Sequence, residues 1–183
     1  TTVVTLPHGM LGLGPNHGGQ LHHQYGVTLD VPPGAVSDTT RFQIRPLLTD
    51  TPPITPPGGL LFANRAFEMN AVRFGEEVRQ FNRPLTITVH YTDADVQGLR
   101  RETLRLWTRA GPAGPWNELG EPARVMSGAL AFTTDHFSEF ALFGEALLAE
   151  PNLAVEVRAP ERVSLDAPYV VNLAYSNLGG LNS

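Results

Sequence analysis

The chain has 183 residues, a formal net charge of −5, 42% hydrophobic residues and no cysteine. This length allows one sizeable domain and part of another, and the apolar content supports a buried core. The composition excludes disulfides and cysteine-ligated metals, and with no basic cluster beyond Arg100-Arg101 it disfavours nucleic acid as a partner. No apolar run reaches the roughly 18 residues of a membrane span.

Alternating apolar residues and frequent turn residues dominate the chain, which contains 18 glycines and 16 prolines. Strands are predicted at residues 1–6, 21–23, 25–31, 40–48, 66–74, 84–91, 103–108, 124–126, 129–133, 134–144, 153–157 and 168–175. For residues 66–74, which lack clean alternation, a helix is the competing prediction. Loops or polar turns are predicted at residues 7–19, 32–35, 49–59, 76–83 and 111–114. One helical turn is predicted to open near Asp93, and Ser127-Gly128 is predicted to close a hairpin.

The clearest alternation occurs in residues 84–91, and residues 40–48 also alternate. The positions predicted to face inward there are Phe42, Ile44, Leu85, Ile87, Val89 and Tyr91. About ten short strands without βαβ alternation predict an all-β fold, an antiparallel β-sandwich.

The stretch 134–144 carries the one spacing that indicates chemistry. Because side chains alternate in an extended strand, His136 and Ser138 are expected to share a face while Phe137 points to the other. A histidine beside a serine can act as general base toward the hydroxyl. Both faces of the following residues are apolar, which predicts a strand buried between two layers.

The C-terminal residues are predicted to form separate β structure. Residues 1–145 form the main domain in this interpretation, 146–152 a linker, and 153–183 a partial immunoglobulin-like domain or a docked strand pair. Two strands do not make a stable sheet alone, so both alternatives remain open.

Other candidate sites have simple structural alternatives. Imidazoles can bind zinc, but the histidines here also fit a solvated loop. Aspartates can bind calcium, but the two here also fit a capped turn. Tryptophans can stack on sugars, but they also fit packing in the core. The residues concerned are His8, His17, His22, His23, Asp93, Asp95, Trp107 and Trp116. No metal and no cofactor is predicted.

Two motifs in the expected order resemble the ZU5 domain of ankyrins, zonula-occludens proteins and netrin receptors. The first is Gly18-Gly19-Gln20-Leu21 followed by an apolar strand that ends in Pro32-Pro33-Gly34-Ala35. The second is His136-Phe137-Ser138, which matches the tripeptide at which some members cut themselves. The resemblance covers residues 1–144, and the segment after it looks like the first strands of a bacterial cell-surface immunoglobulin-like repeat.

The resemblance implies cleavage of the chain's own Phe137-Ser138 bond. Ser138 Oγ would attack the Phe137 carbonyl carbon, with His136 as base, and water would hydrolyse the resulting ester. The alternative is that Ser138 begins a strand while His136 and Asp135 close a turn through side-chain hydrogen bonds.

The function predicted first is therefore a non-enzymatic structural or adhesive module of a secreted, multidomain bacterial surface protein. A self-cleaving module is the alternative, and no catalysis on an external substrate is predicted. The partners expected are neighbouring domains of the same polypeptide or another protein, without nucleic acid or a membrane span. The expected location is extracellular or at the cell surface.

Overall fold

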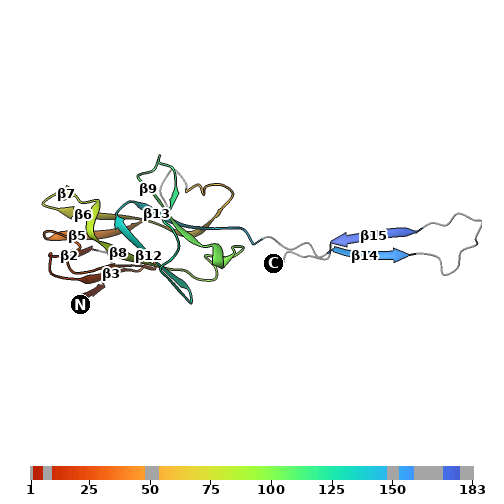
Figure 1. Ribbon diagram of the computed structural model, residues 1–183, viewed down its shortest axis with the longest axis horizontal. Helices are drawn as coiled ribbons and strands as arrows, with labels where there is room; N and C mark the ends of the chain where they lie inside the picture. Colours follow the sequence, from red (N-terminus) through yellow and green to blue (C-terminus); the bar gives the residue numbers. More distant parts are fainter. Residues whose placement is uncertain (1, 6–9, 48–53, 148–152, 159–170, 178–183) are drawn as a thin grey trace, which may run out of the picture. The chain divides into compact units, whose positions relative to one another are not determined.

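The structure is a computed structural model that describes residues 2–5, 10–47, 54–147, 153–158 and 171–177. The chain separates into two units, Thr1–Ala146 and Leu147–Ser183 (Figure 1). The predictions made for His8, residues 48–53, most of residues 146–152 and much of the C-terminal tail lie outside the described residues.

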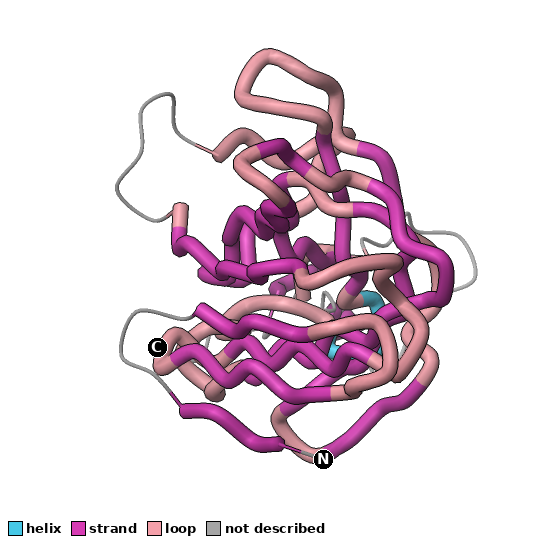
Figure 2. The backbone as a smooth tube through the Cα atoms, turned by 90° about the vertical axis from the view of Figure 1, so that its left-hand side faces the viewer, coloured by secondary structure: helices cyan, strands magenta, loops and turns pink. Residues whose placement is uncertain are grey.

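The first unit is a β-sandwich, and the end view in Figure 2 shows its strands in two layers. One sheet has the order β1-β3-β4-β8-β12-β11, and the other has the order β10-β9-β13-β6-β5-β2 with β7 beside β6. The first sheet comprises β1 (Thr2–Thr5), β3 (Gly19–His23), β4 (Val27–Val31), β8 (Gln80–His90), β11 (Arg124–Met126) and β12 (Ala129–His136). The second comprises β2 (Met10–Leu13), β5 (Thr40–Pro46), β6 (Leu61–Arg73), β7 (Glu76–Glu77), β9 (Arg105–Arg109), β10 (Asn117–Glu118) and β13 (Glu139–Gly144).

All strand pairs of this unit are antiparallel except β1 with β3, which is parallel. The predicted fold class, an all-β antiparallel sandwich, is confirmed. The predicted alternation also holds in β5 and β8. In β5, Phe42 and Ile44 are buried while Arg41 and Gln43 are exposed. In β8, the buried residues are Leu85, Ile87 and Val89. Inward-facing residues of both sheets form one continuous core.

Three local predictions were wrong. Residues 7–19 were expected to be a loop, but β2 lies within them because Leu11 and Leu13 alternate inward and pair with β5. Residues 76–83 were expected to be a polar turn, but β7 and the start of β8 occupy them, because β7 pairs with β6 and Gln80 pairs with His136 of β12. Residues 93–98 form a non-helical turn, and a 3₁₀ helix, η1, comes later at Arg101–Thr103.

Both faces of β13 are buried, as the sequence predicted. Phe140 and Leu142 point into the core between the sheets. Ala141 and Phe143 point outward into a second apolar cluster that includes Trp107. The strand is therefore central in its sheet and covered on both sides.

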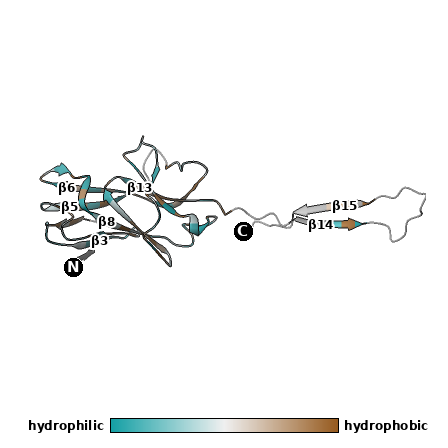
Figure 3. Ribbon diagram, in the orientation of Figure 1, coloured by the Kyte–Doolittle hydropathy of each residue, from teal (hydrophilic) through white to brown (hydrophobic). Residues whose placement is uncertain are grey.

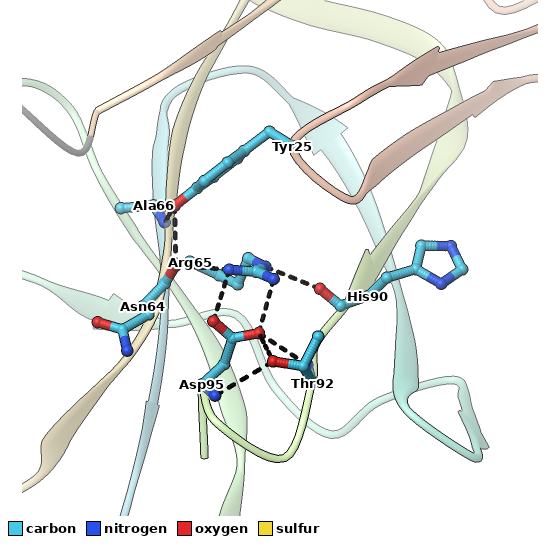
Figure 4. Close-up of polar contacts among 7 residues, drawn as sticks. All are labelled: Tyr25, Asn64, Arg65, Ala66, His90, Thr92 and Asp95. Carbon is cyan, nitrogen blue, oxygen red and sulfur yellow. Dashed lines mark hydrogen bonds and ion pairs between the residues drawn. The ribbon is translucent and has the colours of Figure 1, made fainter. Parts of the chain in front are cut away.

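A polar cluster joins the two sheets at one end of the sandwich (Figure 4). Arg65 on β6 donates two hydrogen bonds to Asp95, at 2.8 and 2.6 Å, and a third to the carbonyl of His90, the last residue of β8. Its guanidinium lies 5.2 Å from the ring centroid of Tyr25. Asn64 has a φ of +52°, a conformation that asparagine tolerates well, at the position just before Arg65.

The second unit contains one described hairpin, β14 (Leu153–Arg158) and β15 (Asn172–Asn177), paired antiparallel. Along β14, hydrophobic and hydrophilic colours both occur in Figure 3. Val157 and Leu173 are direct cross-strand partners, and both are exposed.

Candidate functional site

The tripeptide His136-Phe137-Ser138 lies where the chain crosses from one sheet to the other. His136 is the last residue of β12 in the first sheet, and β13 in the second sheet begins at Glu139. The expectation that His136 and Ser138 share a face of one continuous strand was therefore wrong. The alternation rule does not apply because residues 137 and 138 belong to no strand, and a register shift already precedes His136.

Phe137 anchors this crossover in the core. Its side chain is buried, and its ring lies 4.6 Å from that of Phe81 and 5.9 Å from that of Phe42, centroid to centroid. Its backbone N–H donates a hydrogen bond of 2.9 Å to the carbonyl of Arg79. On the other side of the Phe137-Ser138 bond, the Ser138 carbonyl accepts a hydrogen bond of 3.1 Å from Met69 N–H. The chain is thus fixed on both sides of this bond.

The Ser138 hydroxyl and the His136 ring each bind other groups. Ser138 Oγ donates to the Arg109 carbonyl at 2.7 Å. His136 Nδ1 lies 3.0 Å from Asp135 Oδ1 and 3.4 Å from Thr134 Oγ1. The hydrogen bond to His136 lowers the pKa of the Asp135 carboxyl. The contact between Asp135 and His136 agrees with the turn-closing alternative, but both residues lie at the end of β12, and the next strand begins at Glu139 and not at Ser138.

The backbone at the crossover has no left-handed residue. Among the described residues other than glycine, only Asn64 and Phe74 have positive φ. The Phe137-Ser138 bond is therefore not flanked by that form of strain.

A hollow of about 530 Å³ opens beside the tripeptide. Its wall includes a buried ion pair in which Arg109 Nε donates to Glu139 Oε2 at 2.6 Å, with both side chains 8% exposed. The Arg109 guanidinium also lies 4.5 Å from a ring centroid of Trp116. Sequence reasoning missed this pair. The available signal was a lone carboxylate at the start of an otherwise apolar strand.

The other candidates are dispersed. His22 and His23 lie on opposite faces of β3, and no group of three potential metal-ligating side chains exists among the described residues. Asp95 binds Arg65, while Asp93 pairs with Arg101 at 2.7 Å. Trp107 and Trp116 both pack against Phe143, so their rings are engaged within the protein.

Comparison with known proteins gives one family. The model of the ZU5 domain matches residues 12–109, which run from β2 to the end of β9 and end before the tripeptide. No curated protein matches the chain. The match covers more than half of the chain, and the β-sandwich agrees with it. This protein therefore belongs to the ZU5 domain family and contains a protein-interaction module.

Proposed function

We propose that the chain serves as a non-enzymatic structural or adhesive module within a secreted, multidomain bacterial surface protein. Membership of a protein-interaction family supports this role. The partners in this proposal are neighbouring domains of the same polypeptide or another protein. In the part of the chain that the structure describes, no helix is both long and apolar enough to cross a membrane.

The β14–β15 hairpin is the observation that carries the multidomain proposal. Two strands alone are marginally stable in water. Val157 and Leu173 lie directly opposite each other in the register and are 60% and 68% exposed. We infer that further strands cover this apolar pair in the intact protein, as in the first hairpin of an immunoglobulin-like domain.

Hydrogen exchange tests this proposal. Amides of residues 153–158 and 171–177 are expected to exchange quickly in the 183-residue chain and slowly in the polypeptide isolated from its source. An antibody raised against residues 1–146 should bind intact source cells. Equal protection of the hairpin in both samples, or antibody binding only after the cells are lysed, would contradict the proposal.

A second proposal is cleavage of the Phe137-Ser138 bond by the chain itself. The observation that favours it is the double anchoring of the crossover beside the hollow described above. Phe137 is held by two phenyl rings and by Arg79, while Met69 holds Ser138. Because the nucleophile and the carbonyl are already joined in one chain, proximity reduces the entropic cost of reaction.

The reaction balances with water as its only co-reactant. Ser138 Oγ forms a bond to the Phe137 carbonyl carbon, the carbon–nitrogen bond breaks, and the Ser138 nitrogen takes a proton. Water then hydrolyses the ester to a Phe137 carboxylate and the Ser138 hydroxyl. His136 accepts the hydroxyl proton only after Ser138 Oγ has turned away from the Arg109 carbonyl.

Intact-mass spectrometry decides this second proposal. Cleavage gives one fragment ending at Phe137 and one starting at Ser138, and Ser138→Ala leaves the chain whole. Thr133→Ala, an exposed change on β12, serves as the control that still cleaves. A single uncut mass after prolonged incubation at several pH values removes self-cleavage and leaves the interaction module in place.

A further inference from the structure

The outward face of the first sheet carries a hollow of about 690 Å³ that belongs to neither proposal above. Five strands contribute to its lining, β3, β4, β8, β12 and β11. A second hollow of about 570 Å³ adjoins it and shares Asp30 and Thr86. Single-ligand sites in proteins occupy roughly 300–1,000 Å³, so the first hollow alone is large enough for a small ligand.

The strand register explains why this face is hollowed. His22, Thr28, Thr88, Ala131 and Arg124 form one row across the five strands. Long side chains occupy the two ends of this row, and short ones occupy the middle. In the adjacent row, Gln20, Asp30 and Thr86 are neighbours in the same way. A flat sheet face therefore becomes a trough with hydroxyl groups along its floor.

Hydrogen bonds between neighbouring strands hold the polar groups of the trough in place. Gln20 Nε2 donates to Asp30 Oδ1 at 2.7 Å, and His22 Nδ1 lies 2.9 Å from Thr28 Oγ1. Thr28 is only 7% exposed, so its hydroxyl lies at the floor rather than in bulk water. A site whose side chains are fixed before binding loses less conformational entropy when a ligand arrives.

The chemistry of the lining selects the ligand class. The hollow has one carboxylate, Asp30, and one guanidinium, Arg124, so it favours neither an anion nor a cation. Burial, followed by repulsion from His22, lowers the pKa of His90, which keeps that imidazole neutral near pH 7. Threonine hydroxyls both donate and accept hydrogen bonds, while Ala131 and Met126 supply apolar contact.

We propose that this trough binds a neutral carbohydrate, a ligand whose hydroxyl groups match the threonines and the Asp30 carboxylate and whose C–H faces match the apolar residues. The proposal is independent of self-cleavage and of the domains that follow residue 146. It assigns the outward face of the first sheet as an adhesive surface. The sugar-binding role that the tryptophans suggested in the sequence is not involved, because those rings pack against Phe143.

The test uses the whole 183-residue chain on an array of neutral and acidic oligosaccharides, followed by calorimetric titration of the best neutral one. Thr88→Val keeps the shape of the side chain and removes its hydroxyl, and Asp30→Asn removes the carboxylate but leaves an acceptor for Gln20. Each is expected to weaken binding by about tenfold, the value of one to two lost hydrogen bonds.

Thr133→Val is the matched control. Thr133 is an exposed threonine directly opposite Thr86 in the register and does not line the hollow. The Thr133→Val variant should therefore bind the oligosaccharide with the affinity of the wild type. Thermal unfolding of each variant verifies that the fold is intact. Binding to acidic glycans alone, no glycan binding at millimolar concentration, or unchanged affinity in folded Thr88→Val and Asp30→Asn would each overturn the proposal.

Discussion

Asp93 and Asp95 lie two positions apart in one turn but have different surroundings. Asp95 is 13% exposed and receives hydrogen bonds from Thr92 and Arg65, whereas Asp93 is 89% exposed and pairs with the exposed Arg101. Burial by itself would raise the pKa of Asp95, but the hydrogen bonds from Thr92 and the Arg65 charge outweigh it and lower that pKa. The ionised carboxylate is therefore part of the folded state.

Asp95→Asn is expected to reduce the free energy of unfolding by about 2–3 kcal/mol at pH 7, because Arg65 loses its charged partner. Since the folded pKa is below the unfolded one, this contribution is present above about pH 4 and is lost as the pH falls through the folded pKa. Urea unfolding at pH 7 and pH 3 measures both effects. Asp93→Asn should change stability by less than about 0.5 kcal/mol, and equal losses in the two variants would refute the argument.

His23 is a buried histidine whose protonation is less favourable in the folded protein than in the unfolded chain. It is 7% exposed, and its Nδ1 accepts a hydrogen bond from Tyr25 N–H at 3.1 Å. Burial, and to a lesser degree the neighbouring His22, lowers its pKa. The unfolded chain therefore takes up a proton before the folded protein does as the pH falls below about 6.5.

The free energy of unfolding should consequently decrease as the pH is lowered from 7.5 to 5. In His23→Asn the amide oxygen can still accept from Tyr25 but does not titrate, so the decrease should be smaller. Chemical denaturation at the two pH values measures the difference. An identical pH dependence in both proteins would show that His23 contributes nothing to it.

At the scale of elements, the turn of the β6–β7 hairpin contains Phe74 in a left-handed conformation that phenylalanine adopts poorly. Phe74 and Gly75 both have positive φ, +53° and +85°, which is the pattern of a tight hairpin turn that favours asparagine followed by glycine. Phe74 is also 81% exposed, so its ring contributes little burial. Phe74→Asn should raise the free energy of unfolding by about 0.5–1 kcal/mol.

Thermal unfolding measures this gain. Asn64, which already holds a left-handed position in β6, provides the opposite case. Asn64→Ala should be destabilising by about 1 kcal/mol. A decrease in melting temperature for Phe74→Asn would mean that the ring makes contacts that its exposure conceals.

Two glutamates on paired strands allow a comparison of buried and exposed ion pairs. Glu139 of β13 and Glu68 of β6 are direct partners in the register. Glu139 binds Arg109 in a buried site, whereas the Glu68–Arg45 pair is 26% and 49% exposed.

Glu139→Gln should lower the free energy of unfolding by about 3–5 kcal/mol, because it leaves the Arg109 charge buried without a counterion. Glu68→Gln should cost less than about 1 kcal/mol. Denaturant unfolding of both variants checks the contrast. Similar small losses would show that water reaches the Arg109 site.

Alternation predicted the strands that supply the core, because an apolar residue at every second position has only one buried arrangement. Alternation failed to predict strands that form because a partner strand pairs with them. β2 and β7 are short and contain glycine or charge, and their pairing with β5 and β6 is visible only in the folded chain. The prediction of one continuous strand over residues 134–144 was wrong for the same reason. Nothing in the alternation of these residues marks the change from one sheet to the other at Phe137.

At the scale of the whole molecule, the two units divide near residue 146. Leu99 forms a bridge with Ala146, and Arg100 N–H donates to the Glu145 carbonyl, so the first unit extends to this point. Among the residues that the structure describes, none beyond Ala146 belongs to its core. The first unit should therefore fold without the second.

A chain ending at Leu147 is expected to melt within about 2 °C of the full chain, since it retains all of the described core. Thermal unfolding followed by circular dichroism near 215 nm tests this. A chain ending at Phe137, which lacks the central strand β13, is the contrasting variant and should not fold. A loss of more than about 5 °C in the longer truncation would show that residues 148–183 support the sandwich.

The central place of β13 also has a mechanical consequence. This strand is hydrogen-bonded to β6 on one side and to β9 on the other, and it is the last strand before the second unit. Tension that pulls β13 along its own axis loads its hydrogen bonds to β6 and to β9 at the same time, in shear. It does not break these hydrogen bonds one after another. For a module exposed to flow or to traction between surfaces, this geometry gives resistance to extraction even if the backbone has been nicked just upstream.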